Sequence, residues 1–374
     1  MGPGSERAPR SALLDLLRFA AAGLIVLYHY RFDSPIKLDL FSPLFDRGYL
    51  ATDFFLILSG YVLGRAYGRQ IALGKVSDEQ FLLRRVMRVW PAHVVMLVAF
   101  AAVIGAAEMA GRAPHNAAQV QWRDWPAQLA LIQAWGLHRG EGWNVPTWTL
   151  SALIVCYAGF PTLWRRTLGD WPAASLLVIG VSVLAGADLV SEALYGQGVF
   201  DLPSNLGVMR ALPLFVFGAL VARASEAGWP LRRWAPWQAI AAFAGFCVLQ
   251  ATGKFDLPSM ALLGLMIGAA GEVPARGRSG LADRAAKVSF ALYITHVFVA
   301  TLWFNFIHAV DARFNPPAWE QWSLWGMAFP AALIAAVVFE RWADRPLQAG
   351  VAALLRPRPG RYPALAPNGS GRRH

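Results

Sequence analysis

The chain has 374 residues, of which 56% are hydrophobic and only 15% are charged, and its formal net charge is +11. Because soluble domains usually carry about 25% charged residues, this composition excludes a disordered chain and a coiled coil and indicates an integral membrane protein. The two cysteines, Cys156 and Cys247, lie in apolar stretches, so we expect no disulfide framework and no thiolate metal site.

Ten segments are apolar enough to cross a membrane as helices, which requires about 20 mostly apolar residues. In chain order they cover residues 11–32, 49–66, 89–107, 147–164, 172–190, 207–223, 235–250, 257–271, 288–306 and 321–340. A shorter apolar piece near 126–138 begins at a Trp-Pro pair, and we interpret it as interfacial or re-entrant. The predicted fold is therefore an all-α membrane bundle of about ten helices.

The positions of the charges predict the orientation of this bundle. With ten spans and a cytoplasmic N-terminus, 24 of the 34 Lys and Arg residues fall on the cytoplasmic side, in agreement with the positive-inside rule. We therefore predict a cytoplasmic segment 1–10, a membrane domain 11–348 and a disordered basic cytoplasmic tail 349–374. The basic charge then orients the chain in the lipid bilayer, and no nucleic-acid partner is expected.

Polar residues within spans are functional candidates, because lipid makes them costly. Arg18 and His29 lie eleven residues apart in the first span, so they share one helix face about 16 Å apart along the axis. Two structural roles remain open for them. Arg18 could pair with Asp15 at the helix entrance, and His29 could be an interfacial residue.

The second span contains Asp53, which enters the membrane at a depth similar to that of His29. A carboxylate at this depth could orient the imidazole of His29 and stabilise its protonated form. Two structural roles are equally consistent with the sequence: Asp53 could cap the start of its helix, or it could pair with Arg47.

Three arginines, Arg84, Arg85 and Arg88, precede the third span. Arg85 and Arg88 are one helical turn apart and therefore share a face at the cytoplasmic surface. Guanidinium forks suit phosphate recognition. Juxtamembrane arginines also bind lipid headgroups, so the spacing alone does not decide between a ligand site and a membrane contact.

Together these segments resemble the membrane-bound acyltransferase family three. The matching motifs, in the family's order, are LDLLRFAA with the following histidine, GYLATDFFLILSGY, FLLRRVMRVWP, Asn144–Ser151, Val288–His296, and Phe339-Glu340-Arg341 before Arg345-Pro346. Each motif is loose, but six in order form a specific signal that covers about residues 11–348.

The resemblance implies transfer of an acyl group, most often acetyl, from cytoplasmic acyl-CoA to a sugar hydroxyl of an extracytoplasmic glycan such as exopolysaccharide or O-antigen. The expected acceptor partner is a glycan or a lipid-linked saccharide, and the sequence leaves this choice open. The membrane would be the bacterial inner membrane. By position, His29 matches the catalytic base of the family, Arg18 matches its partner arginine, and Arg85 and Arg88 match an element associated with the donor. No metal ion is needed for this thioester chemistry.

Other polar residues are weaker candidates. Asn144 and Trp148 lie at an outer helix entrance and could contact a sugar, although Trp is common at membrane interfaces for physical reasons alone. Tyr293 and His296 lie within a span, where hydrogen bonds in the packed bundle compete with a role in lining a tunnel. The sequence also departs from the family at Ala152, near which many members have a glutamate.

A rival hypothesis is a transporter or flippase of a glycan or lipid-linked substrate, which would also be a bundle with buried charges. It predicts substrate movement without consumption of acyl-CoA. The near lack of acidic residues in span centres and of an internal repeat argues mildly against it. The oligomeric state is left open by the sequence.

Overall fold

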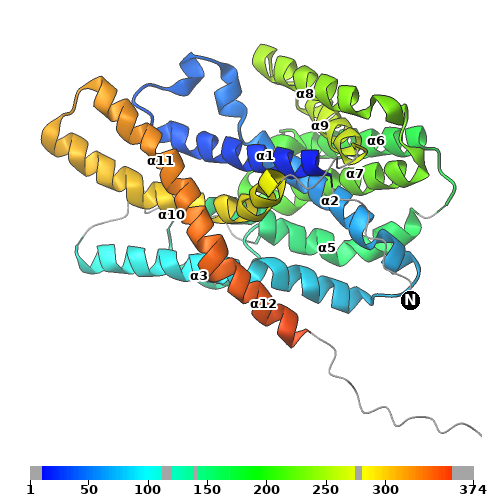
Figure 1. Cartoon of the computed structure of the whole chain (residues 1–374), viewed down its shortest axis with the longest axis horizontal. Helices are drawn as coiled ribbons and strands as arrows, with labels where there is room; N and C mark the ends of the chain where they lie inside the picture. The colour runs from blue at the N-terminus through cyan, green and yellow to red at the C-terminus, as the bar shows by residue number, and fades with distance from the viewer. Residues whose placement is uncertain (1–10, 112–119, 138–141, 168, 274–279, 356–374) are drawn as a thin grey trace, which may run out of the picture.

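The computed structural model shows a bundle of helices (Figure 1) and describes residues 11–111, 120–137, 142–167, 169–273 and 280–355. Within these ranges there is no β-strand, and the chain is an all-α integral membrane protein. The helices are α1 (Ala12–Tyr30), α2 (Leu50–Ala72), α3 (Asp78–Met109), α4 (Trp125–Leu129), α5 (Trp148–Arg166), α6 (Ala173–Tyr195), α7 (Gly207–Gly228), α8 (Ala235–Thr252), α9 (Asp256–Gly271), α10 (Gly280–Phe314), α11 (Ala318–Phe339) and α12 (Arg345–Leu354).

Each of the ten predicted spans coincides with one of the helices α1–α3 and α5–α11. Six helical segments are long and apolar enough to cross a membrane on length and composition alone: Ala12–Asp33, Asp78–Met109, Ala173–Tyr195, Ser204–Gly228, Gly280–Phe314 and Ala318–Leu354. The short piece predicted near 126–138 contains only the five-residue helix α4 and a turn at Leu131, so it does not span; residue 138 lies outside the described residues.

The chain runs back and forth along the bundle, which therefore has two ends (Figure 1). We call the end at which α1 finishes and α2 begins the His29 end, because His29 lies in the last turn of α1. The opposite end, at which α2 finishes and α3 begins, is called the Arg85 end.

The C-terminal part of the chain continues as a helix beyond the expected end of the membrane domain. A π-helical turn over Glu340–Asp344 leads into α12, which extends to Leu354, whereas the sequence predicted a disordered tail from 349. Apolar residues at Leu347, Val351 and Leu354 repeat at helical spacing, which favours an amphipathic helix here. Residues 1–10 and 356–374 lie outside the described residues.

Two glycines allow α2 and α7 to pack backbone against backbone at the centre of the bundle. A Cβ atom added at Gly60 would lie 2.1 Å from the carbonyl oxygen of Phe215, and one added at Gly218 would lie 1.9 Å from that of Ile57. Small residues serve this purpose in membrane helices, where close packing stabilises the helix pair. The close contact between α2 and α7 fixes the position of Asp53 on α2 relative to Arg210 on α7.

We expect Gly218→Ala to destabilise the protein by about 3 kcal/mol, because the new methyl group meets backbone atoms that cannot rotate away. The matched control is Gly186→Ala on α6, since a Cβ there meets nothing within 4 Å. That control should be neutral or slightly stabilising, because Ala is the better helix former. Thermal unfolding of the purified protein in detergent measures both; equal midpoints for the two variants would contradict the packing described here.

Candidate active site

His29 is positioned by the first helix of the bundle. Helix α1 begins at Ala12 after the N-cap Ser11, whose hydroxyl oxygen accepts a hydrogen bond from the backbone N–H of Leu14 at 3.4 Å and donates one to the carbonyl oxygen of Ala270 at 2.7 Å. This cap satisfies one of the free donors at the helix start and ties α1 to α9. His29 lies in the last turn, where its ring contacts Tyr28 with centroids 5.3 Å apart.

The second histidine of the site, His296, faces His29 from α10. The two ring centroids are 5.1 Å apart, and His296 is fully buried. Nδ1 of His296 lies 3.1 Å from the carbonyl oxygen of Leu292, which can only accept a hydrogen bond, so Nδ1 carries the proton. The buried Nε2 of His296 has no hydrogen-bond partner among the described residues. In the neutral ring this nitrogen is an acceptor with a free lone pair.

Tyr30 fixes the distance between these two helices. Its hydroxyl donates to the carbonyl oxygen of His296 at 3.0 Å, and its ring packs on Phe304 with centroids 5.2 Å apart. The indole N–H of Trp325 donates to the carbonyl oxygen of Tyr30 at 2.9 Å. The residue that follows His29 is therefore held by α10 and α11 together, which fixes the end of α1 beside His296.

Tyr293 and Asn144, expected to contact substrate, are engaged in the packing around this pair. The Tyr293 hydroxyl lies 2.7 Å from that of Thr149 and donates to the carbonyl oxygen of Pro146 at 2.8 Å. Asn144 donates to the carbonyl oxygen of Ile294 at 2.9 Å, while its buried Oδ1 has no partner among the described residues. Neither side chain lines the cavity described next, so in this structure both act on the position of α10.

A cavity of about 1170 Å³ opens at the His29 end of the bundle. His29 and Trp148 both line it, together with residues from α2, α3, α7 and α10 and from the loops between them. Such a volume exceeds what an acetyl group requires and matches the size range of sites for larger organic ligands. The imidazole of His29 is therefore accessible to a ligand in the cavity. His296, which contacts His29, does not line the cavity.

Asp53 is paired with Arg210, not with His29. The Arg210 guanidinium donates to both carboxylate oxygens of Asp53, at 2.8 Å from Nε and 2.7 Å from Nη2, and both residues are buried. The expected Asp53–His29 contact is thus replaced by a bidentate ion pair between α2 and α7. The physical reason is that a buried carboxylate needs full charge compensation, which a guanidinium fork supplies and a neutral imidazole does not.

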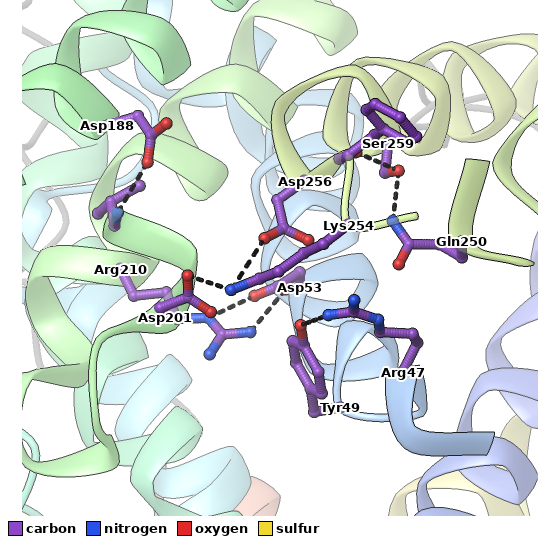
Figure 2. A network of polar contacts seen from close by, with 12 residues as sticks. Arg47, Tyr49, Asp53, Asp188, Asp201, Arg210, Gln250, Lys254, Asp256 and Ser259 are labelled. Atoms are coloured by element: carbon purple, nitrogen blue, oxygen red, sulfur yellow. Dashed lines mark hydrogen bonds and ion pairs between the residues drawn. The ribbon is translucent and has the colours of Figure 1, made fainter. Parts of the chain in front are cut away.

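Further charged side chains surround this pair at the His29 end, as Figure 2 shows. The ammonium group of Lys254 contacts the carboxylates of Asp201 and Asp256, the latter at 3.8 Å. Arg47 donates to the hydroxyl of Tyr49 at 3.1 Å. Partial burial alone would lower the pKa of Lys254, but the neighbouring carboxylates outweigh it and the net shift is upward, so this lysine remains charged.

The predicted donor-side arginines gather at the Arg85 end. Arg85 donates to the hydroxyl of Tyr67 at 2.8 Å, and its buried Nε has no partner among the described residues. Arg88 donates to the carboxylate of Asp344 at 3.1 Å, and Arg84 is exposed one residue before Arg85. Arg88 therefore contacts the π-helical turn that precedes α12 through Asp344, a pair that the sequence did not predict.

Arg18 lies on α1 between the two ends and pairs with Asp15 at 3.8 Å, as the structural interpretation of the sequence allowed. Ile25, which lies farther along the same helix, is buried together with Ala51 and Tyr293, with Phe55 packed against them, and Ile25 also lines the cavity. The described residues that line the cavity include His29 but neither Arg18 nor Arg85 nor Arg88.

Comparison with known protein families assigns the chain to one of them. A family model described as "Acyltransferase domain" matches residues 12–341, which is most of the chain and includes every helix from α1 to α11. The chain belongs to this acyltransferase family. The resemblance inferred from the six motifs is thereby confirmed.

Two curated proteins are similar to parts of this chain. Acyltransferase MdmB of Streptomyces mycarofaciens is 31% identical over 132 residues, which cover 34% of this chain and 31% of that protein. Protein 2 in the picA locus of Rhizobium radiobacter is 37% identical over 93 residues, which cover 25% of this chain and 45% of that protein. The matches thus span less than half of either relative. No solved structure matches the chain significantly.

Arg210, the partner of Asp53, was not predicted from the sequence. Arg210 stands near the start of the sixth predicted span and Asp53 near the start of the second, and both spans were expected to begin on the same side of the membrane. Two opposite charges at one depth in lipid are expected to pair, so this coincidence is the signal that could have found the pair. Among the residues that the structure describes, no group of three or more His, Cys, Asp or Glu side chains could hold a metal ion.

Proposed function

We propose that this acyltransferase moves an acyl group, most often acetyl, from cytoplasmic acyl-CoA to a sugar hydroxyl of an extracytoplasmic glycan such as exopolysaccharide or O-antigen. The observation that carries the proposal is the position of His29, whose imidazole lines a cavity of about 1170 Å³ in a bundle that belongs to an acyltransferase family. A histidine is the side chain best suited to act as a general base near neutral pH.

In this proposal the Arg85 end faces the cytoplasm and the His29 end faces the outside of the inner membrane, as the distribution of basic residues favours. The anionic phosphates of acyl-CoA then bind Arg85 and Arg88, with Arg84 at the surface, because guanidinium forks match phosphate oxygens. The pantetheine arm extends into the bundle past Arg18. The acceptor enters the cavity at the opposite end.

The chemistry at His29 is a direct transfer. One ring nitrogen of His29 takes the proton of the acceptor hydroxyl as its oxygen attacks the carbonyl carbon of the thioester. The new C–O bond forms and the C–S bond breaks, so CoA leaves as a thiolate. The proton then passes from His29 to that sulfur, which regenerates the neutral imidazole and releases CoA as a thiol.

His296 is the positioning residue for this base in place of Asp53. Its Nδ1–H is fixed on the carbonyl oxygen of Leu292, so its unpartnered Nε2 can accept the second ring N–H of His29. A ring-centroid distance of 5.1 Å allows this contact after a small rotation of either ring. His296 would thereby hold the tautomer that leaves the reactive nitrogen of His29 free to take a proton.

In this proposal the pantetheine arm also passes the apolar cluster of Ile25, Ala51 and Tyr293, which has to open to admit it. The rings of Phe55 and Tyr293 lie 5.5 Å apart within this cluster, beside Ile25. Side-chain rotation here is the smallest movement that would admit a pantetheine arm. The donor's acyl group would then meet the acceptor hydroxyl only after the cluster has opened, which protects the thioester from water in the cavity.

We expect His296→Phe to lower kcat by about 10- to 100-fold, with little change in the KM for acyl-CoA, because the ring is retained but the acceptor nitrogen is lost. His296→Gln should recover part of the rate, since its side-chain oxygen can accept the same N–H. The pH profile of kcat should shift in both variants. A rate and pH profile unchanged in His296→Phe would show that the residue has only a packing role.

The experiment that tests the function measures free CoA thiol released from acetyl-CoA by the purified protein in proteoliposomes. Release that depends on added glycan acceptor, with matching acetylation of the acceptor, supports the proposal. Movement of the glycan across the bilayer without thiol release would instead favour a transporter or flippase. In the proposed enzyme, Arg85→Gln raises the KM for acetyl-CoA, whereas Arg69→Gln, at the same end of the bundle, does not.

A further inference from the structure

The cavity at the His29 end has two chemically different arms. The first, which we call the polar arm, is lined by Arg47, Tyr49, Asp201, Arg210 and Lys254. The second, which we call the apolar arm, lies between α3 and α10 and is lined by Phe100, Val103, Ile104, Val297 and Leu302. A small polar ligand would make no favourable contacts with the apolar arm. The lining of this arm therefore indicates the chemical class of the acceptor.

His29 stands where the two arms meet. Its neighbour Tyr28 contacts the ring of Tyr49 in the polar arm, with centroids 5.9 Å apart. His29 itself contacts His296, which directly precedes Val297 of the apolar arm. A hydroxyl that reacts at His29 therefore belongs to a molecule that extends in one direction over charged groups and in the other over apolar side chains.

The polar arm has the features of a saccharide site. Asp201, Arg210 and Lys254 are held by ion pairs, and Arg47 by its hydrogen bond to Tyr49. Arg210 also lies over the rings of Tyr49 and Trp148, at 5.5 and 5.7 Å from their centroids. Aromatic faces beside fixed polar groups suit a sugar ring, which has apolar faces and a polar edge. Because these groups are already held in place, they bind a ligand at little cost in side-chain entropy.

Among the residues that the structure describes, those lining the apolar arm offer few polar contacts. The polar side chains on its α10 wall, Thr301 and Asn305, donate to carbonyl oxygens of their own helix at 2.9 and 2.6 Å. Phe100 and Ile104 are buried apolar residues on the facing wall. Water in such a space makes few hydrogen bonds, so an apolar ligand group that displaces it gains affinity.

The apolar arm also reaches the lipid face of the bundle. Leu302 lines the cavity and is nevertheless 47% exposed, and Val98 and Phe306 on the same two helices are 52% and 57% exposed. Helices α3 and α10 diverge toward the His29 end in Figure 1, beyond the contact between Phe100 and Phe298. An opening in this direction would admit a molecule from the bilayer, which neither a water-soluble glycan nor CoA needs.

From these observations we infer that the acceptor is a saccharide covalently joined to a lipid. The saccharide occupies the polar arm, the lipid occupies the apolar arm and leaves toward the bilayer between α3 and α10, and the reacting hydroxyl lies at His29. This inference rests on the proposed acyl transfer and narrows it. It selects a membrane-resident acceptor over a finished, water-soluble polysaccharide.

The test supplies radiolabelled acetyl-CoA to the protein in proteoliposomes with one of two fractions from cells that express it, a chloroform–methanol extract or the water-soluble glycans. We expect label in a chloroform–methanol-soluble product, and none with His29→Ala. Label found only in water-soluble glycan, and dependent on His29, would overturn the inference and leave the proposed function intact. Label in neither fraction would contradict both the proposed function and the inference.

Variants of the apolar arm complete the test. Val103→Trp fills the arm and Leu302→Gln makes it polar, and each should lower labelling of the lipid product at least tenfold. Val178→Trp is the control, since Val178 is an exposed apolar residue on α6 outside the cavity, and this variant should stay within twofold of wild type. Undiminished labelling in both arm variants would contradict the inference. So would a defect with octanoyl-CoA alone and not with acetyl-CoA, which would place the donor's acyl chain in the arm.

Discussion

Replacing His29 by alanine is expected to lower acyl transfer by roughly a thousandfold, because proton transfer by a positioned imidazole contributes about 10²–10⁴-fold to such reactions. The loss should appear in kcat, while the KM for acyl-CoA stays near its wild-type value, because the proposed donor arginines lie at the other end of the bundle. The measurement is the initial rate of acetylated product formed from acetyl-CoA.

The matched control for this prediction is His308→Ala. His308 lies near the His29 end, close to Asp33 at 3.4 Å, and is half exposed. Its removal should change the rate less than twofold. A His29→Ala variant that is folded, as judged by size-exclusion chromatography, and that transfers acetyl at the wild-type rate would show that His29 is not the general base. The positioning role of His296 would then be wrong as well.

The second large effect concerns the buried pair of Asp53 and Arg210. Substituting Asp53 by asparagine should destabilise the protein by about 3–5 kcal/mol, because it leaves the guanidinium of Arg210 buried without a counter-charge. Thermal unfolding in detergent reports this loss. The control is Asp78→Asn, which breaks the exposed pair with Arg165 and should leave the unfolding midpoint nearly unchanged, since exposed ion pairs contribute little.

A double variant separates the structural role of Asp53 from a catalytic one. Asp53→Leu combined with Arg210→Met removes both charges and should regain most of the lost stability, because apolar side chains of similar size can replace a buried ion pair. If Asp53 acts only through Arg210, kcat of the double variant falls less than tenfold, although the KM for the acceptor rises. A folded double variant with kcat as low as that of His29→Ala would show that Asp53 has a direct role in catalysis.

The helices could be predicted from the sequence because lipid imposes a length on apolar segments. The predicted ranges fail mainly at helix ends. The second span was predicted to end at residue 66, whereas α2 continues to Ala72, and α3 begins at Asp78 and not at 89. The physical reason is that helical hydrogen bonding continues beyond the hydrocarbon, through turns that carry charges such as Arg69 and Arg84.

The site was only partly accessible from the sequence. The spacing of Arg18 and His29 indicates a shared helix face, because both belong to one regular helix. The partner of each buried group could not be predicted in this way. Asp53 and Arg210 are 157 residues apart, and His29 meets His296 across the α1–α10 interface, so both contacts depend on how helices distant in the sequence pack. Spacing within one helix contains no information on that packing.

In the proposed mechanism an acyl group passes from a donor at the Arg85 end to an acceptor at the His29 end. A decisive experiment uses proteoliposomes with uniformly oriented protein, radiolabelled acetyl-CoA confined to the Arg85 side and the lipid extract's acceptor accessible on the His29 side. We expect labelled acceptor on the His29 side, with free CoA retained on the Arg85 side. Labelling that occurs only when acetyl-CoA is present on the His29 side would contradict it.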